Sequence, residues 1–184
     1  TSAQSPGAIT SSFSQTLSGV VFALRCVVDP TLPMNEGCFR PLRATLPIGT
    51  LVNPAPPAAC GGRIVTVAAA TDAMLRALST ARPERAVAPS GLIHVWTLSG
   101  RQGSWLSLFY EFGGIGARAG SDGPDATGCF FLGGPSVIPQ IEPMEAQYPL
   151  LVRHARLLPD SGGRGRWRGG RGMETEIELL DDAL

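Results

Sequence analysis

The order in which two hydrophobic periodicities follow one another constrains the fold of this chain more than any other feature. Over residues 10–28, apolar side chains recur at helical spacing, with Ser and Thr residues before them and Pro30 after them, as at the ends of a helix. A second segment of this kind covers residues 63–80 and follows a Gly-Gly pair. Beyond residue 90 the apolar residues alternate or run together, as in strands. Two helices followed by a strand-rich half predict an α+β fold with a mixed or antiparallel sheet, rather than regular βαβ repeats.

Four segments of the second half have the pattern of strands. They are LIHVWTL (92–98), WLSLFYEF (105–112), YPLLVRHARLL (148–158) and METEIELL (173–180). A shorter strand is expected around Arg43–Leu46, inside a Pro- and Gly-rich stretch that keeps enough apolar residues to pack as an ordered loop. With 184 residues, 43% of them hydrophobic, the chain is long enough to form a single domain over residues 1–184.

The charged residues exclude several classes of function for this chain alone. All 15 basic residues are arginine, and acidic residues balance them to a formal net charge of +0. A dedicated nucleic-acid binder carries a surplus of positive charge, so no nucleic-acid partner is expected. Without lysine the chain has neither a Schiff-base lysine nor the lysine of a P-loop, which argues against a Walker-type ATPase.

The cysteines and the hydropathy indicate a protein of the cytoplasm. The 4 cysteines lie far apart without a C-x-x-C pair, which favours reduced, mostly buried thiols over a zinc site, and we expect no metal ligands in this chain. No apolar run approaches the roughly 20 residues that a membrane-spanning helix needs, so no membrane partner is expected. His94 and His154 both lie in predicted strands without a second histidine nearby, which argues against a metal site built on either.

A glycine-rich loop, GGIGARAGSDGPDATG (113–128), follows the second predicted strand. Its G-x-G pattern would fit a dinucleotide site if a helix began inside the glycine run, but the sequence continues with the turn-forming residues Ser-Asp-Gly-Pro-Asp. Asp122 and Asp125 fit three roles, namely metal ligand, general base, or Asx-turn residue that holds the loop in shape. Spacing alone favours the turn role. Long glycine loops nevertheless bring backbone close to ligands, and for that reason they are often functional.

A polar cluster within MNEGCFRPL (34–42) is a second candidate. Asn35, Glu36 and Arg40 fall within six residues and could face a substrate or another subunit. The alternative, which spacing favours, is a buried network in which Arg40 pairs with Glu36 and Asn35 holds the turn. Arg63 stands at the glycine-led start of the second predicted helix, where backbone N–H groups can attract an anion.

The segment DSGGRGRWRGGRG (160–172) allows two interpretations. Four arginines among glycines are typical of an RGG-type nucleic-acid segment, but the same glycines also fit a tight loop inside an enzyme. The alternating METEIELL directly after it favours the loop, because an RGG tail is mobile whereas this segment leads into a predicted strand. We therefore expect the segment to be packed, with Trp167 largely buried.

Several motifs of the chain, in their order, resemble the hydantoinase B/oxoprolinase family. They are LPMNEGCFRPL, PIGTLVNPAPPAACGGR, TDAMLRAL, GGIGARAGSDGPDATG and YPLLVRHARLLPDSGGRGRWRGGRG. The family comprises the B-type subunits of ATP-dependent N-methylhydantoinase, the matching half of 5-oxoprolinase, and related subunits of acetone and acetophenone carboxylases. The arginine-glycine segment is similar to the family's signature D-S-G-G-x-G-x-x-R-G-G-x-G. The resemblance thus answers the question in favour of an enzyme loop, with Trp167 as a core or interface anchor.

The chain departs from the family in three ways. The family's B-type subunit is longer, so the resemblance implies an internal to carboxy-terminal fragment that lacks both ends. The family's His/Asp metal motif belongs to the amino-terminal half, so a divalent metal is expected there and no ligand is carried over to this chain. Ile138 and Gln140 stand where the family often has Asn-x-Pro before two glutamates, whereas Glu142 and Glu145 are retained. The third departure leaves room for a carboxylase-like relative.

The resemblance implies one part of an ATP-dependent cyclic-amide hydrolase of the hydantoinase/oxoprolinase type. A hydantoinase A-type partner would bind ATP and Mg and activate the substrate, and this B-type subunit would support ring opening within a hetero-oligomer. The isolated chain is expected to be inactive. The alternatives are a subunit of an ATP-dependent ketone carboxylase, with a small ketone in place of the cyclic amide, and a non-catalytic assembly domain of such a complex.

The predicted site combines the candidates named above. The catalytic residues are expected to be Asp122, Asp125 and Glu36, and the substrate-binding residues Asn35, Arg40 and Arg63. Either of the two arginines would hold phosphate or carboxylate oxygens bidentately. Asp122 would act as an acid/base or as a polar orienter.

Overall fold

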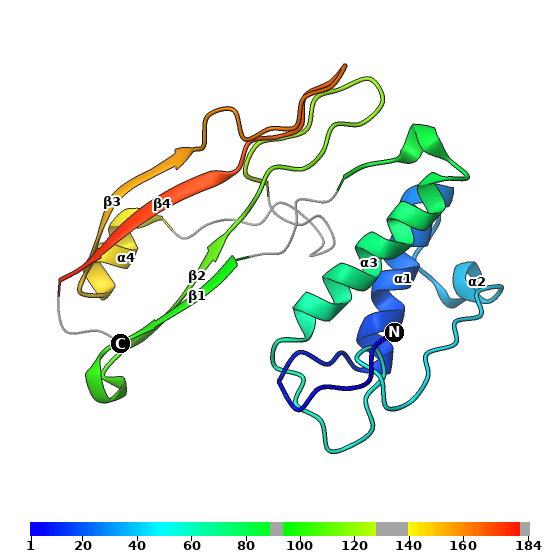
Figure 1. The fold of residues 1–184 in the computed structure, drawn as a ribbon, viewed down its shortest axis with the longest axis horizontal. Coiled ribbons are helices and arrows are strands. Elements are labelled where there is room, and N and C mark those ends of the chain that lie inside the picture. The colour runs from blue at the N-terminus through cyan, green and yellow to red at the C-terminus, as the bar shows by residue number, and fades with distance from the viewer. Residues whose placement is uncertain (89–93, 128–139, 181–184) are drawn as a thin grey trace. The chain divides into compact units, whose positions relative to one another are not determined.

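The computed structural model describes residues 1–88, 94–127 and 140–180 (Figure 1). The chain divides into two compact units, Thr1–Val87 and Ala88–Leu184, and each is described here by itself. Within the described residues the first unit is helical and the second contains the four strands, so the predicted α+β class is confirmed. The single domain over residues 1–184 stays a prediction.

Two helices, α1 (Phe13–Val28) and α3 (Arg63–Ser79), pack side by side in the first unit (Figure 1). Both were predicted, and α1 begins three residues later than expected, because Ser12 is its N-cap and accepts a hydrogen bond from the Gln15 N–H at 3.4 Å. The helices meet closely at Gly19, where an added Cβ would lie 2.5 Å from Thr71 Oγ1. The core of the unit is formed by buried apolar side chains, namely Ala23, Val27, Val52, Val67, Ala68 and Leu75.

Buried hydroxyl groups tie α1 and the segment before it to the loop before α3. The Thr16 hydroxyl donates to the Val52 carbonyl at 2.8 Å, and the Thr10 hydroxyl donates to the Ala59 carbonyl at 2.6 Å. Because a buried hydroxyl without a partner is costly, these bonds fix the loop against the helix. The predicted strand at Arg43–Leu46 is wrong: the segment forms no strand, and the Leu46 carbonyl accepts instead from the Asn53 side-chain amide at 2.7 Å.

Two antiparallel hairpins make up the strands of the second unit. Strand β1 (His94–Ser99) pairs with β2 (Leu106–Glu111), and β3 (Leu150–Leu157) pairs with β4 (Met173–Leu179), with an irregularity between Val152 and His154. All four strands were predicted, and each predicted end differs from the observed end by at most two residues. The described residues place them in two separate two-stranded sheets that are antiparallel throughout.

Four short helical segments were not predicted. They are α2 (Glu36–Phe39), the 3₁₀ turns η1 (Pro83–Arg85) and η2 (Arg101–Gly103), and α4 (Ile141–Gln147). Helix α4 is held against β3, because the Glu145 carboxylate accepts a hydrogen bond from the Val152 N–H at 2.8 Å. Among the helices of the described ranges, none is long and apolar enough to cross a bilayer.

Candidate functional site

Two loops of the second unit, residues 113–127 and 160–172, are hydrogen-bonded to one another along their length; we call them the loop pair. The first follows β2, and the second connects β3 to β4 (Figure 1). The Gly170 N–H donates to the Ile115 carbonyl at 2.9 Å, and the Gly123 N–H donates to the Arg168 carbonyl at 2.8 Å. Backbone bonds of this kind join segments that are distant in sequence, so the loop pair is a tertiary structure rather than two independent turns.

Glycine is required where the two backbones cross. A Cβ on Gly170 would overlap the Pro124 carbonyl, and one on Gly123 would overlap the Ile115 carbonyl. Neither obstacle is the end of a flexible side chain, so a substitution would push the backbones apart. The glycines of the signature segment therefore permit the close approach of two main chains.

Asp125 holds the loop pair together through both of its carboxylate oxygens. Its Oδ1 accepts from the Arg171 backbone N–H at 2.6 Å, and its Oδ2 accepts from Arg171 Nε at 3.0 Å and Nη2 at 2.7 Å. The Arg171 guanidinium and then its backbone N–H lower the pKa of Asp125 from its ordinary value, and the same pairing raises the pKa of Arg171. An ionised carboxylate with three donors is stabilised as an acceptor, which suits a clamp better than a general base.

Asp122 also accepts a hydrogen bond from a backbone N–H of the 160–172 loop, but it accepts only one in the part of the chain that the structure describes. Its Oδ1 accepts from the Arg168 backbone N–H at 2.7 Å, and the residue is exposed. The other carboxylate oxygen of Asp122, Oδ2, makes no hydrogen bond within the described residues. Both carboxylate oxygens of Asp125, in contrast, accept hydrogen bonds. Asp122 therefore combines a structural contact with an oxygen that a ligand can reach.

The polar cluster predicted in residues 34–42 lies around α2 at the surface. Asn35 is the N-cap, its Oδ1 accepting from the Cys38 N–H at 3.1 Å, so it holds the turn as expected. The expected pairing of Arg40 with Glu36 is wrong: both are exposed, and no ion pair joins them in the part of the chain that the structure describes. Their connection is the backbone bond from the Arg40 N–H to the Glu36 carbonyl at 2.9 Å. The charged groups of both residues thus face solvent.

Arg63 begins α3 and is also exposed. Its Nη1 donates to the Cys60 carbonyl at 3.4 Å, and within the described ranges it makes no ion pair. The six predicted site residues thus form two groups. Asn35, Glu36, Arg40 and Arg63 belong to the first unit, and the two aspartates belong to the second.

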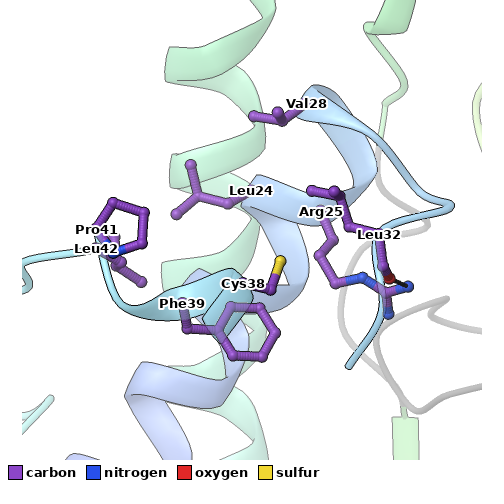
Figure 2. Close-up of a pocket in the computed structure, with 8 residues that line it drawn as sticks. All are labelled: Leu24, Arg25, Val28, Leu32, Cys38, Phe39, Pro41 and Leu42. Carbon is purple, nitrogen blue, oxygen red and sulfur yellow. Dashed lines mark hydrogen bonds between the residues drawn. The ribbon is translucent and has the colours of Figure 1, made fainter. Parts of the chain in front are cut away.

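A mainly apolar pocket of about 280 Å³ lies between α1 and the α2 region (Figure 2). The Cys38 thiol points from α2 toward α1, and the Arg25 guanidinium donates through Nη2 to the carbonyls of Pro30 at 2.9 Å and Leu32 at 2.6 Å. The residues that line it are Leu24, Arg25, Val28, Leu32, Cys38, Phe39, Pro41 and Leu42. The pocket was not predicted from the sequence, although the apolar residues of the 34–42 segment need a surface to pack on.

Trp167 and His154, which were singled out in the sequence, both contact charged side chains. Trp167 is half-buried rather than largely buried, and its ring packs under the Arg166 guanidinium, with Cζ 4.8 Å from the ring centroid. His154 lies between two glutamates across the β3–β4 hairpin, with Nδ1 3.2 Å from Glu176 and Nε2 3.5 Å from Glu174. Ile138 lies outside the described residues.

A model of the family described as hydantoinase B/oxoprolinase matches residues 1–184. The chain therefore belongs to the hydantoinase B/oxoprolinase family, and the resemblance inferred from its motifs is confirmed.

Curated relatives carry the names of three activities. The beta chain of caprolactamase from Pseudomonas jessenii is 33% identical over 98% of this chain and 33% of that protein. The B-type subunit of a putative D-/L-hydantoinase from Pseudomonas sp. (strain NS671) is 32% identical over 86% of this chain and 27% of that protein. A 5-oxoprolinase of Pestalotiopsis fici is 31% identical over 90% of this chain and 13% of that protein. The chain spans about a third or less of the length of these relatives.

Solved structures share the fold. The crystal structure of ATP-dependent caprolactamase from Pseudomonas jessenii matches all of this chain and 33% of that chain, with a TM-score of 0.84 and 31% identity. A nucleotide-free acetone carboxylase structure matches 95% of this chain and 24% of that chain, with a TM-score of 0.75 and 22% identity. At that identity the second likeness shows the fold alone.

Proposed function

We propose that this chain is part of an ATP-dependent cyclic-amide hydrolase, in which it belongs to the B-type subunit. The observation that carries the proposal is the match of the whole chain to ATP-dependent caprolactamase, with a TM-score of 0.84. The family match over residues 1–184 and the names hydantoinase and 5-oxoprolinase among the relatives point to the same chemistry. The substrate class is a small cyclic amide.

The partner of this chain is an A-type subunit that binds ATP and Mg and activates the amide oxygen. Two relatives are named as subunits, which supports a hetero-oligomer. The residues present here do not fit a P-loop or a metal centre of their own. The chain has no lysine, and its described residues hold no group of three His, Cys, Asp or Glu side chains that could bind a metal. No step of the reaction is therefore assigned to a metal on this chain.

The predicted site residues differ in what they can contribute. In the first unit Glu36, Arg40 and Arg63 present charged groups to solvent, and in the second unit Asp122 presents a carboxylate oxygen, so each of these groups is open to a ligand. Guanidinium groups at Arg40 and Arg63 suit the phosphate that activation places on the substrate. Asn35 and Asp125 make bonds that hold α2 and the loop pair, and they position rather than react.

A ketone carboxylase is the second candidate, because the acetone carboxylase structure has the same fold. Both activities use ATP to turn a poorly reactive carbonyl or amide into an activated species, and they differ in what then reacts with it. The cytoplasm stays a prediction for the location.

Reconstitution tests the proposal. The chain, completed to a full B-type subunit, is mixed with an A-type partner, and ADP formation is measured together with ring opening of a lactam, 5-oxoproline and hydantoin. ADP formation coupled to ring opening of a cyclic amide is expected. Carboxylation of acetone in bicarbonate, without ring opening of any of the three amides, would replace the hydrolase with the second candidate. Turnover by the 184-residue chain alone would contradict the need for a partner.

A further inference from the structure

The loop pair carries a local surplus of positive charge in a chain that is neutral overall. Its two segments contain five arginines and three aspartates, whereas the formal net charge of the chain is +0. Asp125 is already neutralised by the bidentate contact with Arg171, so the surplus lies with the other arginines.

Three of these arginines, Arg164, Arg166 and Arg168, are exposed within a stretch of five residues. Arg164 and Arg166 make no ion pair with any carboxylate in the described ranges. Arg168 makes a long one, 3.9 Å from Nη2 to Asp125 Oδ1, and its side chain is 49% exposed. Guanidinium groups without counter-charges attract anions from solution, and their planar N–H forks match phosphate oxygens.

The backbone beneath these arginines is held at both sides, so they extend from a fixed base. The Gly169 N–H donates to the Gly163 carbonyl at 2.9 Å and closes the short loop that contains all three. The Arg168 N–H donates to Asp122, and its carbonyl accepts from Gly123, which anchors this loop to residues 113–127. A fixed base lowers the entropy that binding must overcome, in contrast to a flexible basic tail.

An aromatic ring lies among the charges. The Arg166 guanidinium stacks on Trp167, with 4.8 Å between Cζ and the ring centroid, and this contact orients one of the three cations. The arginines at 164, 166 and 171 also occupy variable positions of the family signature described above. Their charge is therefore a feature of this chain that the signature does not require.

We propose that Arg164, Arg166 and Arg168 form a binding site for a polyphosphate group such as a nucleoside triphosphate carries. The three guanidinium groups neutralise the phosphate oxygens, and the hydrogen-bonded loop holds their backbone in place. The site is independent of the proposed amide hydrolysis and does not require the partner subunit.

Isothermal titration of the 184-residue chain with inorganic tripolyphosphate, and in parallel with ATP, tests the proposal. Both should bind, and the affinity should fall as ionic strength rises from about 0.01 M to about 0.15 M, because the screening length shortens. Replacing Arg164 and Arg166 together by Gln should weaken binding at least about tenfold, since a hydrogen bond to a charged group is lost at each position. Arg76→Gln, at an exposed position of α3, is the matched control and should bind as the unaltered chain does.

Thermal unfolding of each variant separates loss of the site from loss of the fold, and a variant with lowered Tm is replaced by Arg164→Gln alone. Unaltered affinity in the Arg164→Gln/Arg166→Gln chain, or binding of ATP without binding of tripolyphosphate, would overturn the proposal. A poly-glutamate peptide or a single-stranded RNA that binds more tightly than tripolyphosphate would also overturn it, in favour of an acidic-protein or RNA surface.

Discussion

Asp125 and Arg171, 46 positions apart in the chain, are joined by three hydrogen bonds. The Arg171 guanidinium donates through Nε at 3.0 Å and Nη2 at 2.7 Å to one carboxylate oxygen, and the Arg171 backbone N–H donates to the other at 2.6 Å. This contact fastens the loop after β2 to the end of the loop that leads into β4. Asp125 therefore holds two distant loops together, a role that the residues next to it in the sequence do not indicate.

Replacing Asp125 by Asn should lower the Tm of the chain more than replacing Asp122 by Asn. An amide at position 125 keeps one acceptor oxygen but loses the charge that both Arg171 donors require, whereas an amide at position 122 can still accept from the Arg168 N–H. Calorimetry of the two variants side by side checks this, each serving as the control for the other. Equal Tm values would show that the Asp125–Arg171 pair contributes little to the fold.

The Asp125–Arg171 pair also predicts that the stability of the chain depends on pH in the acid range. The pKa of the Asp125 carboxyl is lowered in the folded chain by the Arg171 hydrogen bonds, so the unfolded chain binds its proton first. The contribution to stability is complete above the unfolded pKa of about 3.9 and is lost as pH falls through the lower folded value. Urea unfolding between those limits should show a steeper loss of stability for the unaltered chain than for Asp125→Asn. Parallel curves for the two proteins would contradict the prediction.

Gly170→Ala should destabilise the chain by about 1–3 kcal/mol or more, as overpacking does. The new Cβ meets the Pro124 carbonyl, a backbone atom that cannot move aside without separating the loop pair. Gly163→Ala is the matched control in the same segment, because a Cβ there meets nothing within 4 Å. Denaturant unfolding of both variants measures the difference. Unchanged stability of Gly170→Ala would show that the two loop backbones can move apart at little cost.

Gly19→Ala in α1 sets two effects against each other. Alanine favours a helix by about 1 kcal/mol over glycine, but its Cβ would lie 2.5 Å from the Thr71 hydroxyl oxygen of α3. We expect the single variant to be less stable than the unaltered chain and Thr71→Ala to restore it. A double-mutant cycle by urea unfolding measures the coupling, and additive effects would exclude close contact between the two residues.

Asp122→Asn should reduce turnover of the reconstituted enzyme by about 10²–10⁴-fold, the usual contribution of a general acid or base. The amide keeps the acceptor for the Arg168 N–H, so the loop should stay folded, and an unchanged Tm would separate chemistry from structure. Arg40→Ala should also reduce activity, mainly through KM if Arg40 binds substrate. Full activity of Asp122→Asn would remove this residue from the catalytic set.

The secondary structure was predictable from the sequence because its signals are local. The apolar stripe of 13–28 and the alternation of 173–179 follow from spacing along a few turns of helix or a few residues of strand. The shorter α2 and α4 carry too few residues for a periodic signal, and Arg43–Leu46 had a strand-like composition without a neighbouring strand to pair with. A strand needs a hydrogen-bonding partner, which a single segment cannot specify.

The sequence by itself determined the family, the α+β class and the presence of a glycine-built loop after β3. Only the tertiary structure decided what the predicted site residues do. It left the charged groups of Glu36 and Arg40 exposed, without an ion pair between them, made Asn35 a helix cap, and joined Asp125 to Arg171 across 46 positions. The physical reason is that periodicity specifies which face of an element is buried, whereas the partner of a polar side chain is set by which distant segments pack together. Backbone crossings at Gly123 and Gly170 bring those segments within hydrogen-bonding distance.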